Sequence, residues 1–356
     1  MVGTVNPADR ADLIRQFEDT KLGVKGLVDS GITVIPPLFV HPPETLADVK
    51  PKGPEEHAVD IPIIDLSAGT REEVVELVAR AAHEVGFFQV VNHGVEPEVL
   101  ERLIGAVRAF HEQDPNIKQA NYTRTGRVSF FSNVDLFHSK AASWRDTLQI
   151  RLSPEFENDE EFPEICRDEL REYDKGIKGL ARELYGLLCE GLGLNTSKLE
   201  DMTCLEARTM VGHYYPQCPQ PDLTFGITSH TDPGVITILL QDEVGGLQIK
   251  RGDEWIDAKP VPGALVVNIG DILQIMSNDE YQSVDHRVLA NPNPKPRVSI
   301  AVFFNPCDRA RTFGPFPELT STERPAAFKV FTFSDYLGRF FSKQLDGKSL
   351  VNYYRV

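Results

Sequence analysis

Cysteines, long apolar runs and N-terminal targeting patterns are scarce or missing in this chain of 356 residues. The five cysteines, at positions 166, 189, 204, 218 and 307, form no C-x-x-C pair and are odd in number. Such scattered cysteines fit a reducing compartment better than a disulfide framework. No apolar run reaches about 18 residues, so we expect neither a transmembrane helix nor a membrane partner. The first residues, MVGTVNPADR, lack the basic and apolar regions of a secretory signal, and we expect a cytoplasmic protein.

Basic side chains are also in the minority. There are 37 Lys and Arg against 53 Asp and Glu, which gives a net charge of −16. Because nucleic acids require a basic binding surface, this balance excludes nucleic acid as a partner. An anionic small ligand must instead be held by a local arginine or lysine. The hydrophobic residues, 41% of the chain, can form a sizeable core. We expect a monomer that acts on a small-molecule substrate.

The N-terminal half and the C-terminal end show the apolar spacing of amphipathic helices. This spacing predicts helices in four places: 71–85, after Pro97, about 164–194 and about 333–344. Strand composition predicts two short strands in the N-terminal third, at 61–66 and 86–91. Pro62 favours a position at a sheet edge for the first of these.

Two other stretches of the N-terminal half have no regular pattern. Residues 36–56 contain six prolines and are interpreted as an extended arm. Residues 112–162 mix aromatic and charged side chains without clean periodicity. Within them, the acidic stretch 155–161 is expected to be a solvated loop.

After residue 205 the pattern changes to that of short β-strands. Runs rich in Val, Ile and Phe lie at 207–215, 226–230, 235–241, 246–250, 264–269, 283–289 and 297–304. Such regular spacing is typical of an antiparallel sandwich or barrel. We therefore expect an α+β fold. Its parts would be a helical region at 1–115, a connecting loop and long helix at 116–204, a β-rich core at 205–310, and a C-terminal helix and tail at 311–356.

Of the nine histidines, one has a carboxylate two residues further on: His230 precedes Asp232. Strand side chains alternate, so both point to the same face of the predicted strand. With His286 from a second predicted strand they would form a facial set of two histidines and one carboxylate. That set holds Fe(II) and leaves other coordination sites open. The alternative is that a single His-x-Asp pair is coincidental and that these histidines are core residues.

The strand predicted at 297–304 divides its side chains between two faces. One face is uniformly apolar and is expected to pack against helices. The other carries Arg297 and Ser299 inward, which is costly in a sandwich unless an anion meets them. A carboxylate held by the guanidinium and the hydroxyl fits this pair, and Tyr215 could donate its hydroxyl to the same ligand. The alternatives are an internal acidic partner for Arg297 and a purely structural Tyr215.

Taken in this order, the motifs resemble those of plant 2-oxoglutarate- and Fe(II)-dependent dioxygenases, specifically the 1-aminocyclopropane-1-carboxylate oxidase homologues. The resemblance covers nearly the whole chain. It is carried by DTKLGVKGLVD (19–29), GFFQVVNHG (86–94), WRDT (144–147), YYP (214–216) and the H-x-D…H…R-x-S pattern. It implies a double-stranded β-helix, or jelly roll, framed by helices. By the same resemblance, 1–115 is the N-terminal dioxygenase region and 205–310 the Fe(II)/2-oxoglutarate domain.

The resemblance also implies roles for individual residues. The iron ligands it implies are His230, Asp232 and His286. The residues it implies for 2-oxoglutarate are Arg297, Ser299 and Tyr215. His213 stands where the family usually has Asn, and it either replaces that side chain or borders the pocket. The expected substrate-binding residues are Phe303, His213, Phe131, Phe130 and Trp144. No catalytic residue is expected beyond the metal ligands.

The activity that follows from the resemblance is oxidation of a plant specialised metabolite. Its cofactors would be Fe(II), the co-substrate 2-oxoglutarate and O2, with ascorbate as the reductant. The expected reaction is hydroxylation or O-demethylation of an aromatic, alkaloid-like or flavonoid-like molecule, with release of succinate and CO2. Three alternatives stay open. They are a 1-aminocyclopropane-1-carboxylate oxidase that uses no 2-oxoglutarate, a ligand-binding protein without turnover, and an iron-independent interaction module.

Overall fold

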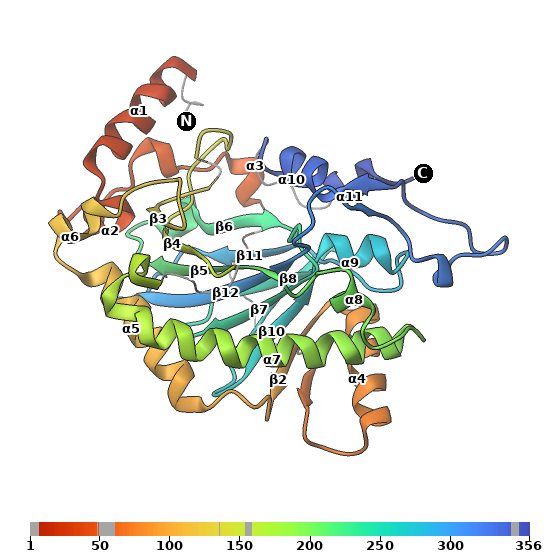
Figure 1. The fold of residues 1–356 in the computed structure, drawn as a ribbon. Helices are drawn as coiled ribbons and strands as arrows, with labels where there is room; N and C mark the ends of the chain where they lie inside the picture. The colour runs from red at the N-terminus through yellow and green to blue at the C-terminus, as the bar shows by residue number, and fades with distance from the viewer. Residues whose placement is uncertain (1–6, 48, 50–60, 135, 154–158, 343–348) are drawn as a thin grey trace.

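The computed structural model describes residues 7–47, 49, 61–134, 136–153, 159–342 and 349–356. Two β-sheets face one another at its centre, and long helices cover the outer face of the larger sheet (Figure 1). This is the α+β jelly roll framed by helices that the sequence predicts.

The larger sheet has eight strands drawn from both halves of the chain. They are β1 (Ile63–Asp65), β2 (Phe87–Val91), β3 (Val128–Phe131), β4 (Asp146–Arg151), β5 (Ala207–Tyr215), β7 (Ile236–Gln241), β10 (Leu265–Ile269) and β12 (Arg297–Asn305). Their order in the sheet is β1-β2-β10-β7-β12-β5-β4-β3. β1 lies at one edge, as Pro62 predicts, and is parallel to β2. The remaining neighbours are antiparallel.

The smaller sheet has four antiparallel strands in the order β6-β11-β8-β9. They are β6 (Phe225–His230), β8 (Leu247–Arg251), β9 (Glu254–Asp257) and β11 (His286–Leu289). Apolar side chains from the two sheets form a shared core, among them Phe87, Ile227, Val266 and Val288. This core fills only part of the space between the sheets, and a cavity occupies another part.

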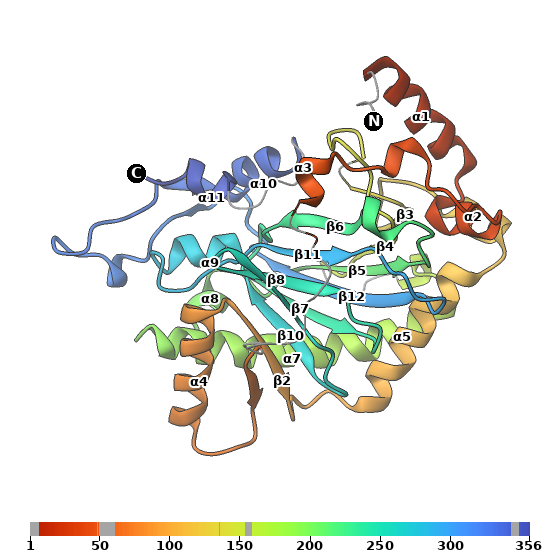
Figure 2. The same cartoon turned by 180° about the vertical axis from the view of Figure 1, so that it is seen from behind.

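Three long helices pack on the outer face of the larger sheet: α4 (Arg71–Glu84), α5 (Pro97–Glu112) and α7 (Arg167–Gly191). Figure 2 shows them from behind, on the side of the large sheet away from the small one. A capping box begins α4, because Thr70 and Glu73 exchange side-chain-to-backbone hydrogen bonds. The apolar face of β12 is buried under these helices. Its other face is therefore turned towards the smaller sheet.

The remaining elements lie outside these two sheets and three helices. The helices are α1 (Pro7–Thr20), α2 (Gly23–Asp29), α3 (Pro43–Leu46), α6 (Pro115–Ala120), α8 (Lys198–Asp201), α9 (Asp271–Met276), α10 (Phe333–Phe341) and α11 (Ser349–Tyr353). A two-stranded ribbon pairs β13 (Thr312–Phe313) with β14 (Phe331–Thr332). Single 3-10 turns lie at Pro37–Phe39, Asp159–Glu161, Glu164–Cys166, Pro221–Leu223 and Pro317–Leu319. Among the described residues, no helix combines the length and apolarity needed to cross a membrane. All five cysteines are free.

The structure corrects several expectations about the N-terminal half. Residues 36–56 are not extended throughout, because a 3-10 turn and α3 form where Pro37 and Pro43 begin the turns. Residues 48 and 50–60 lie outside the described residues. The patternless region 112–162 contains α6, β3 and β4. Of the expected acidic loop, 159–161 forms a 3-10 turn, and 154–158 is not described.

The strand expected at 283–289 is shorter and begins at His286. Its first residues are held out of the sheet because Ser283 donates its backbone N–H to Gln274 Oε1 (2.9 Å) and its hydroxyl to Asp271 Oδ1 (2.7 Å). The division of the chain into four stretches stays a prediction. Strands from its first three stretches join in one sheet.

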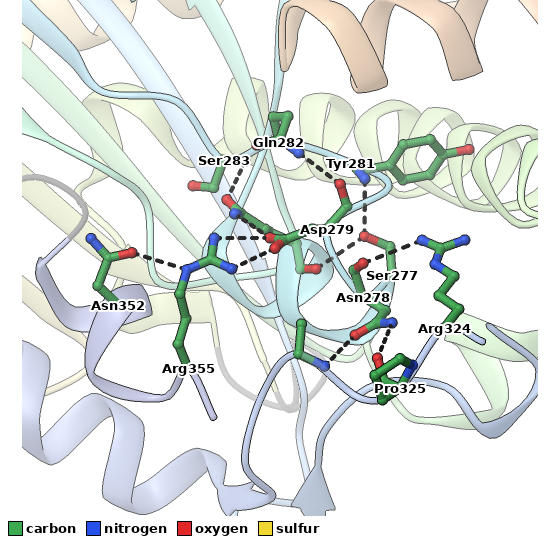
Figure 3. Close-up of polar contacts among 12 residues, drawn as sticks. Ser277, Asn278, Asp279, Tyr281, Gln282, Ser283, Arg324, Pro325, Asn352 and Arg355 are labelled. Atoms are coloured by element: carbon green, nitrogen blue, oxygen red, sulfur yellow. Dashed lines mark hydrogen bonds and ion pairs between the residues drawn. The ribbon is translucent and has the colours of Figure 1, made fainter. Parts of the chain in front are cut away.

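A turn between α9 and β11 is held by the C-terminal part of the chain (Figure 3). Asn278 and Asp279 both have positive φ angles, 54° and 69°, which non-glycine residues adopt at a cost. The Asn278 side chain donates to the carbonyl of Pro325 (3.2 Å) and accepts from the backbone N–H of Ala327 (2.8 Å). Arg355 forms an ion pair with Asp279. These contacts fix the chain that leads into β11.

Replacing Asn278 by Ala should lower the free energy of unfolding by about 2–4 kcal/mol. Two partly buried hydrogen bonds are lost, and alanine tolerates the positive φ less well than asparagine does. Asn278→Gly is the matched control. Glycine loses the same hydrogen bonds but adopts the positive φ without strain. Asn278→Gly should therefore lower the free energy of unfolding by about 1 kcal/mol less than Asn278→Ala does. Urea unfolding of the two variants measures both effects. An Asn278→Ala protein as stable as the unmodified one would contradict this role of the turn.

Candidate metal centre and co-substrate site

The structure brings His230, Asp232 and His286 together at one end of the smaller sheet. His230 ends β6 and His286 begins β11, and the two residues are paired in the sheet register. Their rings lie 4.2 Å apart between centroids. Asp232 Oδ1 lies 3.8 Å from Nε2 of His230 and 3.7 Å from Nε2 of His286. The three potential ligand atoms all lie within 4.8 Å of one another, as a shared metal ion requires.

The remaining atoms of the same side chains are held by hydrogen bonds. Nδ1 of His230 lies 2.9 Å from the carbonyl of Thr228, and Nδ1 of His286 lies 3.2 Å from that of Val284. A proton on each Nδ1 leaves each Nε2 lone pair free for a metal. The outer carboxylate oxygen of Asp232 is fixed by the side chains of Thr237 and Asn268. All three ligand atoms are therefore oriented towards one point.

Two neighbours fix the carboxylate of Asp232. Its Oδ2 accepts hydrogen bonds from Thr237 Oγ1 (2.5 Å) and Asn268 Nδ2 (2.8 Å). Oδ1, the oxygen that faces the histidines, makes neither bond. Thr237 lies on β7 and Asn268 on β10, so the large sheet supplies the orientation of a ligand that follows the small sheet. Such partners of a ligand orient it and strengthen metal binding.

Protonation at this site also suits a metal cation. Burial, reinforced by the neighbouring His286, lowers the pKa of His230 to about 3, so this imidazole is neutral. Burial alone would raise the pKa of Asp232. The facing imidazoles and the hydrogen bonds from Thr237 and Asn268 outweigh it, and the pKa is lower than usual. Two imidazoles and one carboxylate are the donor set that suits Fe(II).

A second buried carboxylate, that of Asp271, lies behind this cluster. Its Oδ1 accepts from Ser283, and its Oδ2 accepts from Tyr336 (2.7 Å) and Thr231 (3.2 Å). Its backbone N–H donates to the carbonyl of Asp232 (2.7 Å). Burial raises the pKa of Asp271 to about 7, although these hydrogen bonds oppose the rise. Asp271 thereby connects the chain segments of the ligands with helix α10.

Arg297 lies at the first position of β12 and is 1% exposed. Its Nη1 donates to Ser299 Oγ (2.9 Å) and its Nη2 to Gln241 Oε1 (3.1 Å). The guanidinium lies 4.8 Å above the ring of Tyr215, a cation–π contact. Its buried Nε has no hydrogen-bond partner. Among the described residues no carboxylate pairs with Arg297, so this buried cation fits an anionic ligand that brings its own carboxylate.

A cavity of about 520 Å³ lies between the sheets and reaches both His230 and Asp232. The register explains its lining. Ser299 of β12 is paired with His213 of β5, and His213 with Thr147 of β4. Four residues along β12, Phe303 is paired with Thr209 and Thr209 with Arg151. Because alternate residues share a face, one side of each of these strands points into the cavity.

Three of the five expected substrate-binding residues line this cavity: Phe303, His213 and Phe131. His213 accepts or donates a hydrogen bond with Thr147 Oγ1 (3.2 Å). Burial, reinforced by Arg145 and Arg297, lowers the pKa of His213 well below its ordinary value. It is therefore a neutral wall of the cavity.

The structure corrects the expectation for Phe130 and Trp144, which do not line the cavity. Phe130 precedes Phe131 on β3, so alternation points it to the opposite face, where it packs against Phe110 and Tyr122. Trp144 is fully buried in a separate N-terminal core and packs edge-on against Phe39. Both aromatics stabilise the frame around the cavity.

Several cavity residues are not among those that the sequence singles out. Arg145 lies just before β4, which supplies Thr147, Gln149 and Arg151. Asn305 ends β12, and the chain beyond it supplies Arg309 and the α10 residues Leu337, Phe340 and Phe341. The alternation R-x-T-x-Q-x-R over 145–151 is the signal that could identify β4. It is easily mistaken for a solvated edge.

A jelly roll that holds two histidines and a carboxylate on one face, beside a buried arginine without a carboxylate partner among the described residues, defines a class of protein. That class is the Fe(II)- and 2-oxoglutarate-dependent oxygenases. Residues 207–306 match the 2OG-Fe(II) oxygenase superfamily, and residues 61–169 match the N-terminal region described as non-haem dioxygenase in morphine synthesis.

Relatives narrow the assignment. The chain is 46% identical to 1-aminocyclopropane-1-carboxylate oxidase homolog 1 of Arabidopsis thaliana, over 98% of this chain and 97% of that protein. It is 48% identical to homolog 4 of the same plant, over 97% and 98%. Among solved structures, JOX2 in complex with 2OG, Fe and JA is 34% identical, with a TM-score of 0.82 and coverage of 94% and 97%. The rice dioxygenase for auxin oxidation is 25% identical, with a TM-score of 0.70 and coverage of 83% and 100%.

The chain therefore belongs to the plant 2-oxoglutarate-dependent dioxygenases, among the 1-aminocyclopropane-1-carboxylate oxidase homologues. It is an enzyme, and its cofactors are Fe(II), 2-oxoglutarate and O2, as the sequence predicts. When bound, the iron and the 2-oxo acid together activate O2 and release succinate and CO2.

Proposed function

We propose that this dioxygenase hydroxylates or O-demethylates an aromatic plant specialised metabolite. In hydroxylation, R–H, O2 and 2-oxoglutarate give R–OH, succinate and CO2. One oxygen atom enters the C–H bond and the other enters succinate. In O-demethylation the oxidised methoxy carbon leaves as formaldehyde. We further propose that the enzyme acts as a cytoplasmic monomer and that ascorbate maintains the ferrous state.

In this proposal His230, Asp232 and His286 hold the iron. The support is the convergence of their ligand atoms and the hydrogen bonds that orient them. Arg297 and Ser299 hold the distal carboxylate of 2-oxoglutarate, with Tyr215 packed against the guanidinium. These residues bind and orient the reactants, and proximity supplies much of their effect. No proton transfer by a protein side chain is required.

The observation that carries the proposal is that one cavity contains both the proposed ligands and a set of aromatic side chains. His230 and Asp232 line it together with Phe131 and Phe303. A planar apolar molecule packed on these rings would have a C–H bond beside the metal. The volume of the cavity, about 520 Å³, lies in the range of small-molecule sites. The names of JOX2 in complex with JA and of the auxin-oxidising enzyme indicate small organic molecules as ligands of related folds.

The test is turnover of a plant metabolite extract by purified protein with Fe(II), 2-oxoglutarate, ascorbate and O2. We expect release of succinate together with a metabolite that gains one oxygen atom or loses one methylene unit, as measured by mass spectrometry. The control omits 2-oxoglutarate and should give neither. Absence of succinate from every extract would overturn the proposal.

The same assay separates the alternatives. A 1-aminocyclopropane-1-carboxylate oxidase would form ethylene from that amino acid without succinate. A ligand-binding protein would bind Fe(II) and a metabolite without releasing succinate. An iron-independent module would be unaffected by His230→Ala.

A further inference from the structure

The cavity beside His230, Asp232 and His286 is positively charged, although the chain as a whole is acidic. Three arginines line it, namely Arg145, Arg151 and Arg309. Among the described residues, its only acidic lining residue is Asp232, whose charge a bound metal would neutralise. In a chain with 53 acidic and 37 basic residues, this composition is the reverse of the average surface. Local arginines of this kind are what an anionic ligand of an acidic protein requires.

Arg151 is brought to the cavity by the register of the large sheet. It ends β4 on the same face as Thr147 and Gln149, and it is paired with Thr209. On the other side of Thr209 lies Phe303. A substrate that packs on Phe303 therefore lies at the same level of the sheet as the Arg151 guanidinium.

Arg309 reaches the cavity from a different segment, the chain that follows β12. Its carbonyl accepts the backbone N–H of Ser334 (3.0 Å), which ties this segment to the start of α10. Arg151 and Arg309 are both exposed. Neither has an ion-pair partner among the residues that the structure describes. Arg145 differs, since it is buried and donates to the carbonyl of Gly226 (3.0 Å).

The cavity also has an apolar part. It includes Phe131, Ile227 and Phe303 from the sheets and Leu337 and Phe340 from α10. The 2-oxo acid has its own arginine, Arg297, which does not line this cavity. The two exposed guanidinium groups are therefore available to another anion. A guanidinium binds a carboxylate strongly and with defined geometry.

We propose that Arg151 and Arg309 bind a single anionic group, a carboxylate, on an otherwise apolar substrate. The inference rests on the proposed function and specifies its substrate class, an aromatic or alicyclic acid. The carboxylate of the substrate lies at the cavity mouth, between β4 and the segment after β12. The apolar body of the substrate extends past Phe303 towards the proposed metal ligands. The carbon to be oxidised is thereby held away from the acid group.

The test uses the holoenzyme, with Fe(II) and saturating 2-oxoglutarate under argon, so that Arg297 is occupied. The probe is 8-anilinonaphthalene-1-sulfonate, which carries one anionic group on an aromatic body. Its uncharged counterpart is N-phenyl-1-naphthylamine. We expect the double variant Arg151→Glu/Arg309→Glu to bind the sulfonate about tenfold more weakly or worse, and the uncharged probe unchanged. Arg251→Glu, on β8 and outside the cavity, is the control for charge reversal and should bind both probes normally.

Each result decides the proposal. Equal affinity of the unmodified protein and the double variant for the sulfonate would overturn it. So would an equal loss for both probes, which would indicate a collapsed cavity, or an equal loss in Arg251→Glu, which would indicate a non-specific charge effect. Failure of the proposed function is distinguishable, because it appears as absence of succinate from the unmodified protein. The contrast between the two probes does not depend on turnover.

Discussion

Asp232→Ala is expected to abolish 2-oxoglutarate-dependent release of succinate. The variant removes the anionic member of the ligand set and leaves two imidazoles, whose affinity for a ferrous ion is much lower. Fe(II) affinity should fall by more than about 100-fold, since losing a residue that merely orients a ligand already costs about 10- to 100-fold. Calorimetric titration with Fe(II) under argon measures binding, and succinate release measures turnover. Retention of either would contradict the proposed metal centre.

Two variants on the large sheet separate this effect from loss of folding. Thr237→Val and Asn268→Ala each remove one hydrogen bond from Asp232 Oδ2. They keep all three ligands. Each should weaken Fe(II) binding by about 10- to 100-fold and lower activity less than Asp232→Ala does. Thermal melting of the metal-free proteins checks that all three variants remain folded. If the two milder variants matched Asp232→Ala, the carboxylate would owe its effect to structure and not to coordination.

The sequence is most informative where alternation coincides with burial. The strand predicted over 207–215 is β5 residue for residue, and β12 differs by one residue. Each has one side against the helical core and one against the cavity. The apolar side identifies the segment as a strand. Because Arg297 and Ser299 then lie on its inward side, they are expected to bind a ligand. His230 and His286 likewise lie on strands that the sequence predicts, whereas Asp232 follows the end of β6 by two residues.

The sequence is least informative where a strand faces the cavity with polar residues. β4 presents Thr147, Gln149 and Arg151 on that face, a pattern that in isolation indicates solvent exposure. These residues line an internal cavity. The pattern therefore predicts polar surroundings correctly but does not predict that the fold encloses them. Phe130 and Phe131 show the same limit, because adjacent aromatics on a strand point to opposite faces and composition does not say which is which.

Contacts distant in the sequence are the remaining part that local patterns do not specify. Asp271 follows a strand and reads as an ordinary start of a helix. Its carboxylate nevertheless accepts hydrogen bonds from Thr231, Ser283 and Tyr336, which lie 40, 12 and 65 residues away. The role of Asp271 as a buried acceptor is evident only once the fold brings its three hydrogen-bond donors together. The orientation of the metal ligands therefore depends on residues that carry no motif.

Arg297→Gln should raise the KM for 2-oxoglutarate by about 100-fold or more, because charge-assisted hydrogen bonds contribute about 1.5–3 kcal/mol each. The affinity for Fe(II) should change little. Arg297→Lys keeps the charge but loses the planar fork, and we expect about a tenfold rise in KM. Ser299→Ala removes a neutral hydroxyl and should raise KM by less than about tenfold.

The KM series, measured by succinate release at varied 2-oxoglutarate, tests the assignment through its rank order. A KM that rises in the order Ser299→Ala, Arg297→Lys, Arg297→Gln would place the distal carboxylate on this guanidinium. Arg297 is buried over Tyr215, so its removal also costs stability, and melting temperatures must accompany the kinetics. A structural role alone would lower the melting temperature of Arg297→Gln and leave its KM for 2-oxoglutarate unchanged. That result would show that the buried Arg297 only stabilises the fold, and the residues that bind 2-oxoglutarate would then be unassigned.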